Sequence, residues 1–464
     1  MDVVAKLTEK LFGNHIQKMV EEQLKAQGTP VLGEVLKRVG DGRATYIPDD
    51  HESYIKNGYL FNPDTYSIIS FIAQKASNIP FSVYQMKDEK ALQLYKSAGP
   101  DETYAKRKMR SKAMNELKDH ELQELFIKPN EIQGWAEFIE QAIGFKLSTG
   151  NTFIHAIGPE NGVNKGKIKE MWILPTQAMD ILSGTQVGMV RGYQMKTNPD
   201  IIIPTAEIIH LKYWTPEYVG GSFLWGLSPI RAARRVISRS NASYDSSVAS
   251  FQNMGALGFV SSDSGAGDPG LTPEQAKIIE DTLATKTGPK NRGKYLVTSA
   301  NLKWQQMGMS PVDLAILESD KVDLRKQCNI FHVPSELFGD TENKTYSNTK
   351  EAGRAIYTNA VIPALSQFRD MFNQHIAKRY GPNIYIDFDT SMLPEMQEDI
   401  NTMITSLQGA WWLTGNEKRE MMVWPKDETE AMMETYLIPM GLVPMGGYMP
   451  TEEEMKSLER KYDL

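Results

Sequence analysis

The sequence predicts an α+β fold in which two neighbouring long helices carry a small domain at their far end. Two similar helix-start signals indicate this layout: Gly226–Ile230 reads Gly-Leu-Ser-Pro-Ile, and Gly308–Val312 reads Gly-Met-Ser-Pro-Val. In each signal the serine can accept a hydrogen bond from a first-turn amide, and the proline takes a position where a missing N–H costs nothing. The stretch between the signals is compact and rich in glycine, which suits a small inserted domain.

Apolar residues recur at heptad spacing after each signal and form a narrow seam. The seam residues are Ile230, Ile237, Tyr244 and Phe251 in the first helix, and Leu314, Leu317 and Leu324 in the second. Such a seam favours a helix packed among other long helices over one that covers a broad core. The first helix should span about 25 residues, on the order of 37 Å. An ordinary helical hairpin with a solvated, charged outer face fits the same pattern.

The two helices carry charges of opposite sign. One face of the first helix presents three arginines, Arg231, Arg235 and Arg239. The second helix offers four carboxylates, Asp313, Glu318, Asp320 and Asp323. We expect ion pairs between the helices, although an exposed pair contributes only about 0–1 kcal/mol.

Before the first signal, helices and strands are mixed without regular β-α-β alternation, which is typical of an α+β domain. We expect one helix after Asp64 and another from Trp135 to Lys146. Strands are expected at Thr152–Ala156, Glu170–Ile173, Gly188–Met195 and Ile208–Tyr213.

Inside the insert, Thr272-Pro273-Glu274-Gln275 is a capping box that starts a helix. The insert is also expected to hold strands at Leu257–Val260, Lys294–Val297 and Leu302–Gln306. After the second helix we expect a third long helix, kinked at Pro363, and then a strand. These two elements should cover Asn348–Lys378 and Asn383–Phe388, and everything after Pro394 reads as helical, including Gln397–Trp412.

Composition is ordinary for a globular protein of two or three domains: 464 residues, 41% hydrophobic and 23% charged. No apolar run approaches the roughly 18 residues that cross a bilayer, so we expect a protein of the cytoplasm without a membrane partner. The net charge of −7 argues against a broad basic surface that grips nucleic acid. The basic run Lys106–Lys112 fits a solvated loop better than a DNA site, and Cys328 fits a small buried hydrophobe better than a nucleophile.

Sequence motifs for catalysis are weak. Gly265–Gly270 formally matches a dinucleotide fingerprint, but no β-α-β unit surrounds it. No phosphate-binding GxxxxGK[ST] segment is present, and the seven histidines form no metal-ligand spacing. Asp387 and Asp389 could bind a cation from one side of a strand, although solvation of the strand end is the preferred interpretation. We therefore expect no catalytic residues, no metal and no cofactor.

An ordered series of short motifs resembles the portal proteins of tailed bacteriophages. It covers roughly Phe61–Pro394 and departs from the family in a longer N-terminus, a charged insert near Lys106–Lys112 and a methionine-rich C-terminus. The series consists of Asn62–Ile69, Ile79–Tyr84, Leu125–Asn130, Trp135–Phe138, Ser148–Ile154, Trp172–Pro175, Glu207–Lys212, the Gly-Leu-Ser-Pro-Ile signal, Leu271–Ala276, Val333–Gly339 and Thr345–Asn348.

The resemblance implies a portal fold with named parts. Residues 1–227 would form the wing with a return segment at 349–390, and 228–254 and 310–332 would form paired stem helices. Residues 255–309 would form the clip, 333–348 the tunnel loop, and 391–464 a helical crown. In the tunnel loop, the residues expected to face the channel are Asp340, Glu342, Asn343 and Lys344.

The function implied by the resemblance is a ring-shaped channel at one capsid vertex of a virion, assembled in the host cytoplasm. The ring would be a homo-oligomer, a dodecamer in the family, with double-stranded DNA passing through its lumen. Its further partners would be the terminase large subunit, a head-tail adaptor, and capsid and scaffold proteins. The alternative is a DNA-packaging nuclease or ATPase, which would need a metal-carboxylate cluster or a phosphate loop.

Overall fold

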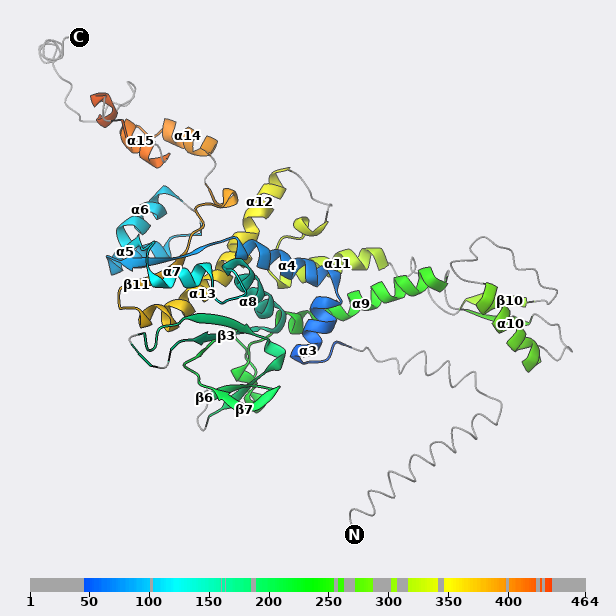
Figure 1. Cartoon of the computed structure of the whole chain (residues 1–464). Helices are drawn as coiled ribbons and strands as arrows, with labels where there is room; N and C mark the ends of the chain where they lie inside the picture. Colours follow the sequence, from blue (N-terminus) through cyan, green and yellow to red (C-terminus); the bar gives the residue numbers. More distant parts are fainter. Residues whose placement is uncertain are drawn as a thin grey trace, which may run out of the picture. The chain divides into compact units, whose positions relative to one another are not determined.

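The computed structural model describes most of the chain and shows a mixed helix and sheet fold (Figure 1). The described residues are 46–100, 103–159, 161–162, 164–184, 189–253, 258–262, 272–286, 302–306, 316–340, 346–397, 400–422, 426–427 and 430–435. Among these residues, no helix combines the length and the apolar character needed to span a membrane.

The first sheet joins the early part of the chain to a strand some three hundred residues later. Its antiparallel order is β11-β1-β2, where β1 is Phe81–Met86, β2 is Met114–Glu116 and β11 is Ile384–Phe388. The register pairs Val83 with Ile386. The strand predicted at Asn383–Phe388 is therefore confirmed, and it closes the sheet next to β1.

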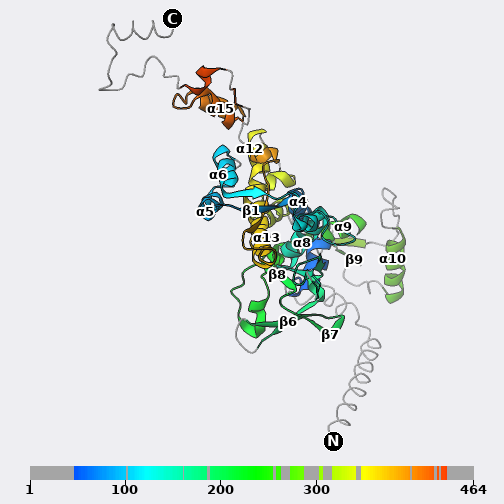
Figure 2. The same ribbon diagram turned by 60° about the vertical axis from the view of Figure 1, so that its left-hand side comes forward.

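Two further three-stranded antiparallel sheets lie near each other. One has the order β4-β3-β8, with β3 at Asn151–Ile157, β4 at Glu170–Leu174 and β8 at Ile208–Lys212. The other has the order β5-β6-β7, with β5 at Met179–Ser183, β6 at Val190–Met195 and β7 at Asn198–Ile203 (Figure 2). A shared apolar cluster connects them, formed by Phe153, Met179, Tyr193, Ile203 and Ile208. The prediction missed β5 and β7.

Helices α4 (Pro63–Ser77) and α8 (Trp135–Thr149) pack side by side, and α8 also packs against β3 and β4. The side chain of Asn62 accepts a hydrogen bond from Thr65 N at 2.9 Å and caps α4, with Pro63 at the first helical position. Aromatic rings fill the space between α8, α7 (Glu121–Ile127) and the first sheet. They belong to Phe81, Phe126, Trp135, Phe372 and Phe388, with ring centres 4.9–6.1 Å apart.

The basic run at Lys106–Lys112 is helical, which corrects the predicted loop. It lies in α6 (Tyr104–Ala113), which packs with α5 (Glu89–Ser97). Arg110 donates two hydrogen bonds to Asp389, at 2.8 and 3.1 Å. This bidentate pair accounts for Asp389 without a bound cation, because an internal arginine already occupies the carboxylate.

The third long helix is interrupted close to the predicted position. It consists of α12 (Tyr346–Ile356), a π-helical turn η6 (Tyr357–Val361) and α13 (Ile362–His375). Proline in a helix clashes with the carbonyl four residues earlier, and a π turn widens the backbone there. Pro363 lies two residues after the end of the π turn, in the first turn of α13, so it needs no N–H partner.

The remaining elements are shorter. In the insert, β9 (Gly258–Ser262) pairs with β10 (Leu302–Gln306), and α10 (Pro273–Lys286) starts with the predicted capping box: Gln275 N donates to Thr272 Oγ1, and Thr272 N donates to Gln275 Oε1. The predicted strand at Lys294–Val297 lies outside the described residues. Towards the C-terminus come α14 (Ile400–Gln408), shorter than predicted, and α15 (Gly415–Met421). The other described helical segments are short: α3 (His51–Ser53), the π-helix η1 (Tyr54–Leu60), η2 (Thr176–Ala178), η3 (Val219–Leu224), η5 (Ser335–Phe338), η7 (Ala377–Arg379), η8 (Pro394–Met396) and η9 (Ala431–Glu434).

A lysine is completely buried on the inner face of α8. Lys146 donates a hydrogen bond to Gln367 Oε1, and its Nζ lies 5.0 and 5.4 Å from the ring centres of Tyr213 and Phe368. Among the hydrogen bonds and ion pairs of the described residues, none joins Lys146 to a carboxylate. Burial lowers the pKa of Lys146 to about 7.

This lysine should make stability depend on pH. The unfolded side chain keeps a pKa of 10.5, so between about pH 7 and pH 10 the unfolded chain binds more protons than the folded chain. Stability should therefore rise with pH in this window. We expect Lys146→Met to be more stable than the native protein at pH 7, with a difference that shrinks by up to about 1.4 kcal/mol per pH unit on going towards pH 10.

Chemical unfolding of both proteins at several pH values measures this effect. Lys90→Met, which removes an exposed lysine of α5, is the control and should show no such dependence. A stability difference between Lys146→Met and the native protein that stays constant from pH 7 to pH 10 would contradict the prediction.

Candidate functional site

The long helix α9 (Pro229–Asn253) begins where two sequence motifs meet. Asn151, at the end of Thr149-Gly150-Asn151, accepts a hydrogen bond from Gly226 N at 2.6 Å through Oδ1. Its Nδ2 donates to Thr149 O at 2.9 Å and to Gly226 O at 3.3 Å. The ring nitrogen Nε2 of His210 lies 3.1 Å from the same Oδ1. One buried amide side chain therefore ties the end of α8 and strand β8 to the segment that starts α9.

Ser228 adds a second tie at the same place. Its Oγ accepts a hydrogen bond from Arg231 N at 3.3 Å, which confirms the predicted cap. The same hydroxyl donates to Ser148 O at 2.6 Å. Ser148 O belongs to the last turn of α8, where carbonyls lack helical partners. The serine thus satisfies free groups of two helix ends with one side chain.

Glycine is required at both sides of this contact, which we call the α8–α9 joint (Thr149–Asn151 with Gly226–Ser228). Gly150 has φ of +78°, and a Cβ there would lie 2.6 Å from Leu227 C. A Cβ on Gly226 would lie 2.2 Å from Gly150 O and 2.8 Å from Tyr213 N. Backbone atoms cannot move aside as a flexible side chain can, so the joint excludes any larger residue at Gly226.

The first part of the predicted seam packs within the chain itself. Ile230 and Ile237 are completely buried in the single chain, and Ala233 lies buried between them. Further along α9, Tyr244 is half-buried and Val248 is 53% exposed. In α11 (Ile316–Ile330), Leu324 is partly buried. Leu314 lies outside the described residues, and the surroundings of the Phe251 and Leu317 side chains are not among those described.

Helices α9 and α11 are neighbours, as predicted, and polar contacts hold them together (Figure 1). Arg239 forms a bidentate pair with Asp323, with Nε 2.8 Å from Oδ2 and Nη2 bound to Oδ1. Ser243 Oγ donates to Asp320 Oδ1 at 2.6 Å. Asp323 is fully buried whereas Arg239 is half-exposed, so the arginine covers a buried carboxylate. The predicted interhelical pairing is confirmed for these residues.

Helix α4 is tied to both long helices through its first turn. Asn62 Nδ2 donates to Ser240 Oγ at 3.1 Å and to Asn241 Oδ1 at 2.9 Å, both on α9. Thr65 Oγ1 donates to Gln327 Oε1 at 2.8 Å, on α11. The residue that caps α4 thus also fixes the position of α9. The sequence predicts a helix after Asp64, but the prediction included neither this cap nor its distant partners.

Carboxylates gather where the three helices meet. Burial raises the pKa of Asp64, a hydrogen bond from Tyr244 opposes this rise, and the charges of Asp320 and Asp323 add to it. Burial also raises the pKa of Tyr244 to about 12. The phenol therefore stays protonated and remains a donor towards Asp64 Oδ2, 3.5 Å away. Asp64, Asp320 and Asp323 each accept a hydrogen bond from a side chain of α9. We therefore assign these carboxylates a structural role.

Arg231 takes different partners from those expected. Its Nε lies 2.9 Å from Asp49 Oδ1, and its Nη1 lies 2.5 Å from Glu217 Oε2. These ion pairs connect the first turn of α9 to the body, not to α11. Of the predicted acidic partners, Glu318 is exposed and Asp313 lies outside the described residues.

The segment after α11 turns sharply before the predicted tunnel loop. His332 has φ of +58°, and Val333 N donates to Cys328 O at 2.9 Å, which ends the helix. Asp340 then receives Arg325 Nε at 2.6 Å, Arg325 Nη2 at 2.7 Å and Ser335 Oγ at 2.9 Å. Its side chain is 12% exposed in the single chain. Glu342, Asn343 and Lys344 lie outside the described residues.

The chemistry available at these helices is limited. Cys328 is buried, and burial raises the pKa of its thiol to about 12, which agrees with the predicted small hydrophobe and disfavours a thiolate. Within the described ranges, no group of three or more His, Cys, Asp and Glu side chains is placed to hold a metal ion. The dinucleotide-like stretch Gly265–Gly270 lies outside these ranges. The arrangement is that of a braced pair of helices, α9 and α11, held together by polar contacts.

A comparison with protein families decides the identity. The family model for phage portal protein matches residues 63–422, which is most of the chain. The chain belongs to the phage portal protein family. The predicted resemblance and the function as a portal protein are thereby confirmed, and so is the mixed helix and sheet fold class.

Known relatives of this portal protein agree with the assignment. Uncharacterised proteins of Rickettsia bellii and Rickettsia felis are each 26% identical to it, over 80% and 79% of this chain and 88% of their own lengths. A chain from the neck of an empty gene transfer agent particle, with C6 symmetry, is 25% identical with a TM-score of 0.57, covering 84% of this chain and 97% of its own. A chain from the neck of the native particle, with C12 symmetry, has a TM-score of 0.54 at 24% identity, covering 85% and 98%.

The α8–α9 joint should be intolerant of one added methyl group. We expect Gly226→Ala to destabilise the portal protein by about 1–3 kcal/mol, because the new Cβ meets backbone atoms of Gly150 and Tyr213. The matched control is Gly144→Ala in α8, where a Cβ would meet no atom within 4 Å. That change should be neutral or stabilise by up to about 1 kcal/mol.

Thermal and chemical unfolding of the three proteins provide the measurement. Equal stability of Gly226→Ala and the native protein would show that the joint can open without loss, and would remove its role in positioning α9.

Proposed function

We propose that copies of this portal protein form a closed ring, a dodecamer, at one capsid vertex of a virion and surround a channel for DNA. The observation that carries the proposal is the braced pair α9 and α11, which is fixed to the body by the α8–α9 joint and by α4. A ring that encloses a moving polymer needs walls that keep their angle to the body. The C6 and C12 symmetry of the gene transfer agent necks supports a ring of this kind.

We assign the parts of the chain by analogy with the family. Residues 1–227 with 349–390 would form the wing, 228–254 and 310–332 the stem, 255–309 the clip, 333–348 the tunnel loop and 391–464 the crown. The contact between α9 and α11 supports the stem, and the β9–β10 pair with α10 supports a small separate unit between the stem helices.

In this assignment the clip faces the terminase large subunit during packaging and a head-tail adaptor afterwards. The outer surfaces of the ring contact capsid and scaffold proteins during assembly in the host cytoplasm. The chain itself performs no chemistry in the proposed role. Its net charge of −7 suits a channel through which DNA slides, because many phosphate contacts would hold the duplex in place.

The ring is tested by its assembly and by its lack of ATP hydrolysis. We expect purified full-length protein to form closed rings in electron micrographs, with a mass near twelve chains by native mass spectrometry, and no phosphate release from ATP. Gly226→Ala should lower the yield of rings, whereas Gly144→Ala should not. A stable monomer at micromolar concentration would overturn the channel, and metal-dependent DNA cleavage would favour the packaging enzyme instead.

We also infer that Asp340 anchors the tunnel loop while Glu342, Asn343 and Lys344 face the channel. The support is the double hydrogen bond between Arg325 and Asp340, which fixes a residue in the middle of the proposed loop at 333–348. In the sequence, Glu342, Asn343 and Lys344 follow Asp340 after a single intervening threonine. Asp340 would hold the loop in place, and the tip of the loop would contact the DNA.

Replacing Glu342, Asn343 and Lys344 by Gly-Ser-Gly should leave ring assembly unchanged but alter DNA retention in packaged particles. Asp340→Asn should leave the rings intact and lower the melting temperature, because Arg325 loses its bidentate pairing with a carboxylate; the loss should be about 1–3 kcal/mol. Asp200→Asn, an exposed carboxylate of β7, is the control for a lost charge. Failure of the triple variant to form rings would place these residues in an interface instead.

A further inference from the structure

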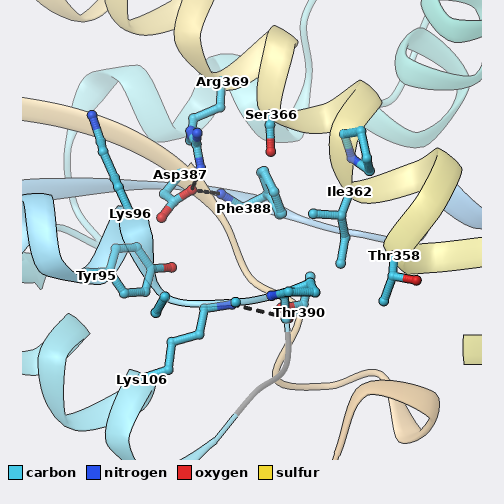
Figure 3. Close-up of a pocket in the computed structure, with 14 residues that line it drawn as sticks. Tyr95, Lys96, Lys106, Thr358, Ile362, Ser366, Arg369, Asp387, Phe388 and Thr390 are labelled. Carbon is cyan, nitrogen blue, oxygen red and sulfur yellow. Dashed lines mark hydrogen bonds and ion pairs between the residues drawn. The ribbon is translucent and has the colours of Figure 1, made fainter. Parts of the chain in front are cut away.

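A pocket of about 280 Å³ opens at the outer edge of the first sheet (Figure 3). It lies between the α5–α6 pair on one side and the π turn η6 with α13 on the other. The end of β11 forms its floor. Its lining includes Tyr95, Lys106, Ile362, Ser366, Arg369 and Asp387.

A buried carboxylate in this pocket lacks half of its hydrogen bonding. Asp387 is 2% exposed, and its Oδ1 accepts a hydrogen bond from Phe388 N at 3.0 Å. Its Oδ2 makes no hydrogen bond of good geometry in the described part of the chain. Burial raises the pKa of the Asp387 carboxyl, and the Tyr95 hydroxyl and the charge of Arg369 oppose this rise. Leaving a buried acceptor without a well-made hydrogen bond is unfavourable by more than a typical hydrogen bond contributes. The site is therefore incomplete as it stands.

Nearby cations do not complete it. Arg369 Nη1 lies 3.8 Å from Asp387 Oδ1, beyond hydrogen-bond distance, and Arg369 Nε donates to Asp370 Oδ1 at 3.0 Å. Lys106 Nζ donates to Pro100 O at 3.2 Å, and Lys96 Nζ lies 4.7 Å from the ring centre of Tyr385. Figure 3 shows the Lys96 amine directed away from the carboxylate. Each cation has its own partner and none reaches Oδ2.

The outward-facing backbone groups of Ile386 in β11 are already hydrogen-bonded within the chain. Asn373 Oδ1 accepts from Ile386 N at 2.9 Å, and Asn373 Nδ2 donates to Ile386 O at 2.7 Å. The carboxylate of Asp387 caps the next outward amide, Phe388 N. Because the edge is already satisfied by side chains, the missing group is a donor for Asp387 Oδ2 and not a peptide backbone.

The walls of the pocket fit a short apolar stem. Ile362, Pro363 and Phe388 supply apolar surface, and Figure 3 shows the hydroxyls of Tyr95 and Ser366 turned towards the space. A volume of about 280 Å³ accommodates a few methylenes with one planar or tetrahedral cationic head. A bare divalent metal ion fits less well, because only one carboxylate faces the space.

We propose that this pocket binds an alkylguanidinium or alkylammonium group whose N–H donates to Asp387 Oδ2. The stem lies against Ile362, Pro363 and Phe388. Two sources share this chemistry: a free small amine, and an arginine or lysine side chain of an adjacent copy in the ring. Only the second source depends on the proposed ring. Binding of a free amine in the pocket would therefore remain valid even if the ring did not form.

Isothermal titration of the full-length protein with ethylguanidine tests the free-amine source, with N-ethylurea as a neutral probe of similar shape. We expect ethylguanidine to bind at least about tenfold more tightly than N-ethylurea. Asp387→Asn should remove this preference while keeping the cap on Phe388 N, because asparagine retains one oxygen. Ser366→Leu should abolish binding by filling the pocket without touching the carboxylate. Glu116→Gln, an exposed change on β2 of the same sheet, should bind as the native protein does.

Electron cryomicroscopy of native rings, with and without the probe, tests the other source. Density for an arginine or lysine of the neighbouring copy at Asp387, lost in Asp387→Asn rings, would show that the assembly fills the pocket. In that case the rings would not bind the added probe. Density for the probe assigns it to a free amine. Only water beside Asp387 in both maps, or equal binding of ethylguanidine and N-ethylurea, would overturn the proposal. Circular dichroism of each variant confirms that it has folded.

Discussion

The buried side chain of Asn151 is the contact on which the rest of the architecture depends. It binds Gly226 through both its oxygen and its nitrogen, and so fixes the point and direction in which α9 leaves the body. Ser228 adds a second tie two residues later through Ser148 O. These bonds set the direction in which α9 starts, and the contacts of Asn62 and Arg231 then hold it, since a small angular error at the start of a 25-residue helix grows along its length. The glycines on each side exist to let the two backbones come this close.

The long helices are fastened by polar contacts more than by apolar burial. Among the seam residues whose burial the structure describes, Ile230 and Ile237 near the joint are fully buried, and Tyr244 and Leu324 are partly buried. Further along α9 the contacts with α11 are Arg239 with Asp323 and Ser243 with Asp320. Directional hydrogen bonds specify one register between two helices, whereas an apolar face tolerates sliding. Burial of Asp323 beneath a half-exposed arginine makes that register costly to lose.

Local signals allowed much of this fold to be predicted. The start and length of α9, the strands β3, β4, β8 and β11, and the capping box of α10 all follow from caps and alternation that act over a few residues. The helix at Lys106–Lys112 was missed because its charges suggested solvent, while Arg110 is in fact folded onto Asp389, far away in the sequence. Strands β5 and β7 were missed because β7 has little burial and weak alternation. The site partners Asn62 with Ser240, and Arg325 with Asp340, depend on tertiary proximity that no local pattern encodes.

The side chain of Asn373 occupies the place where a neighbouring strand would bind β11. An open sheet edge is a template on which other chains can add, and a protein that gathers in many copies meets that hazard constantly. The donor and the acceptor of Ile386 are both engaged by this one amide, so another strand cannot form its hydrogen bonds to β11 at this residue. Copies of the protein that gather closely are therefore prevented from extending the sheet at this point of its edge.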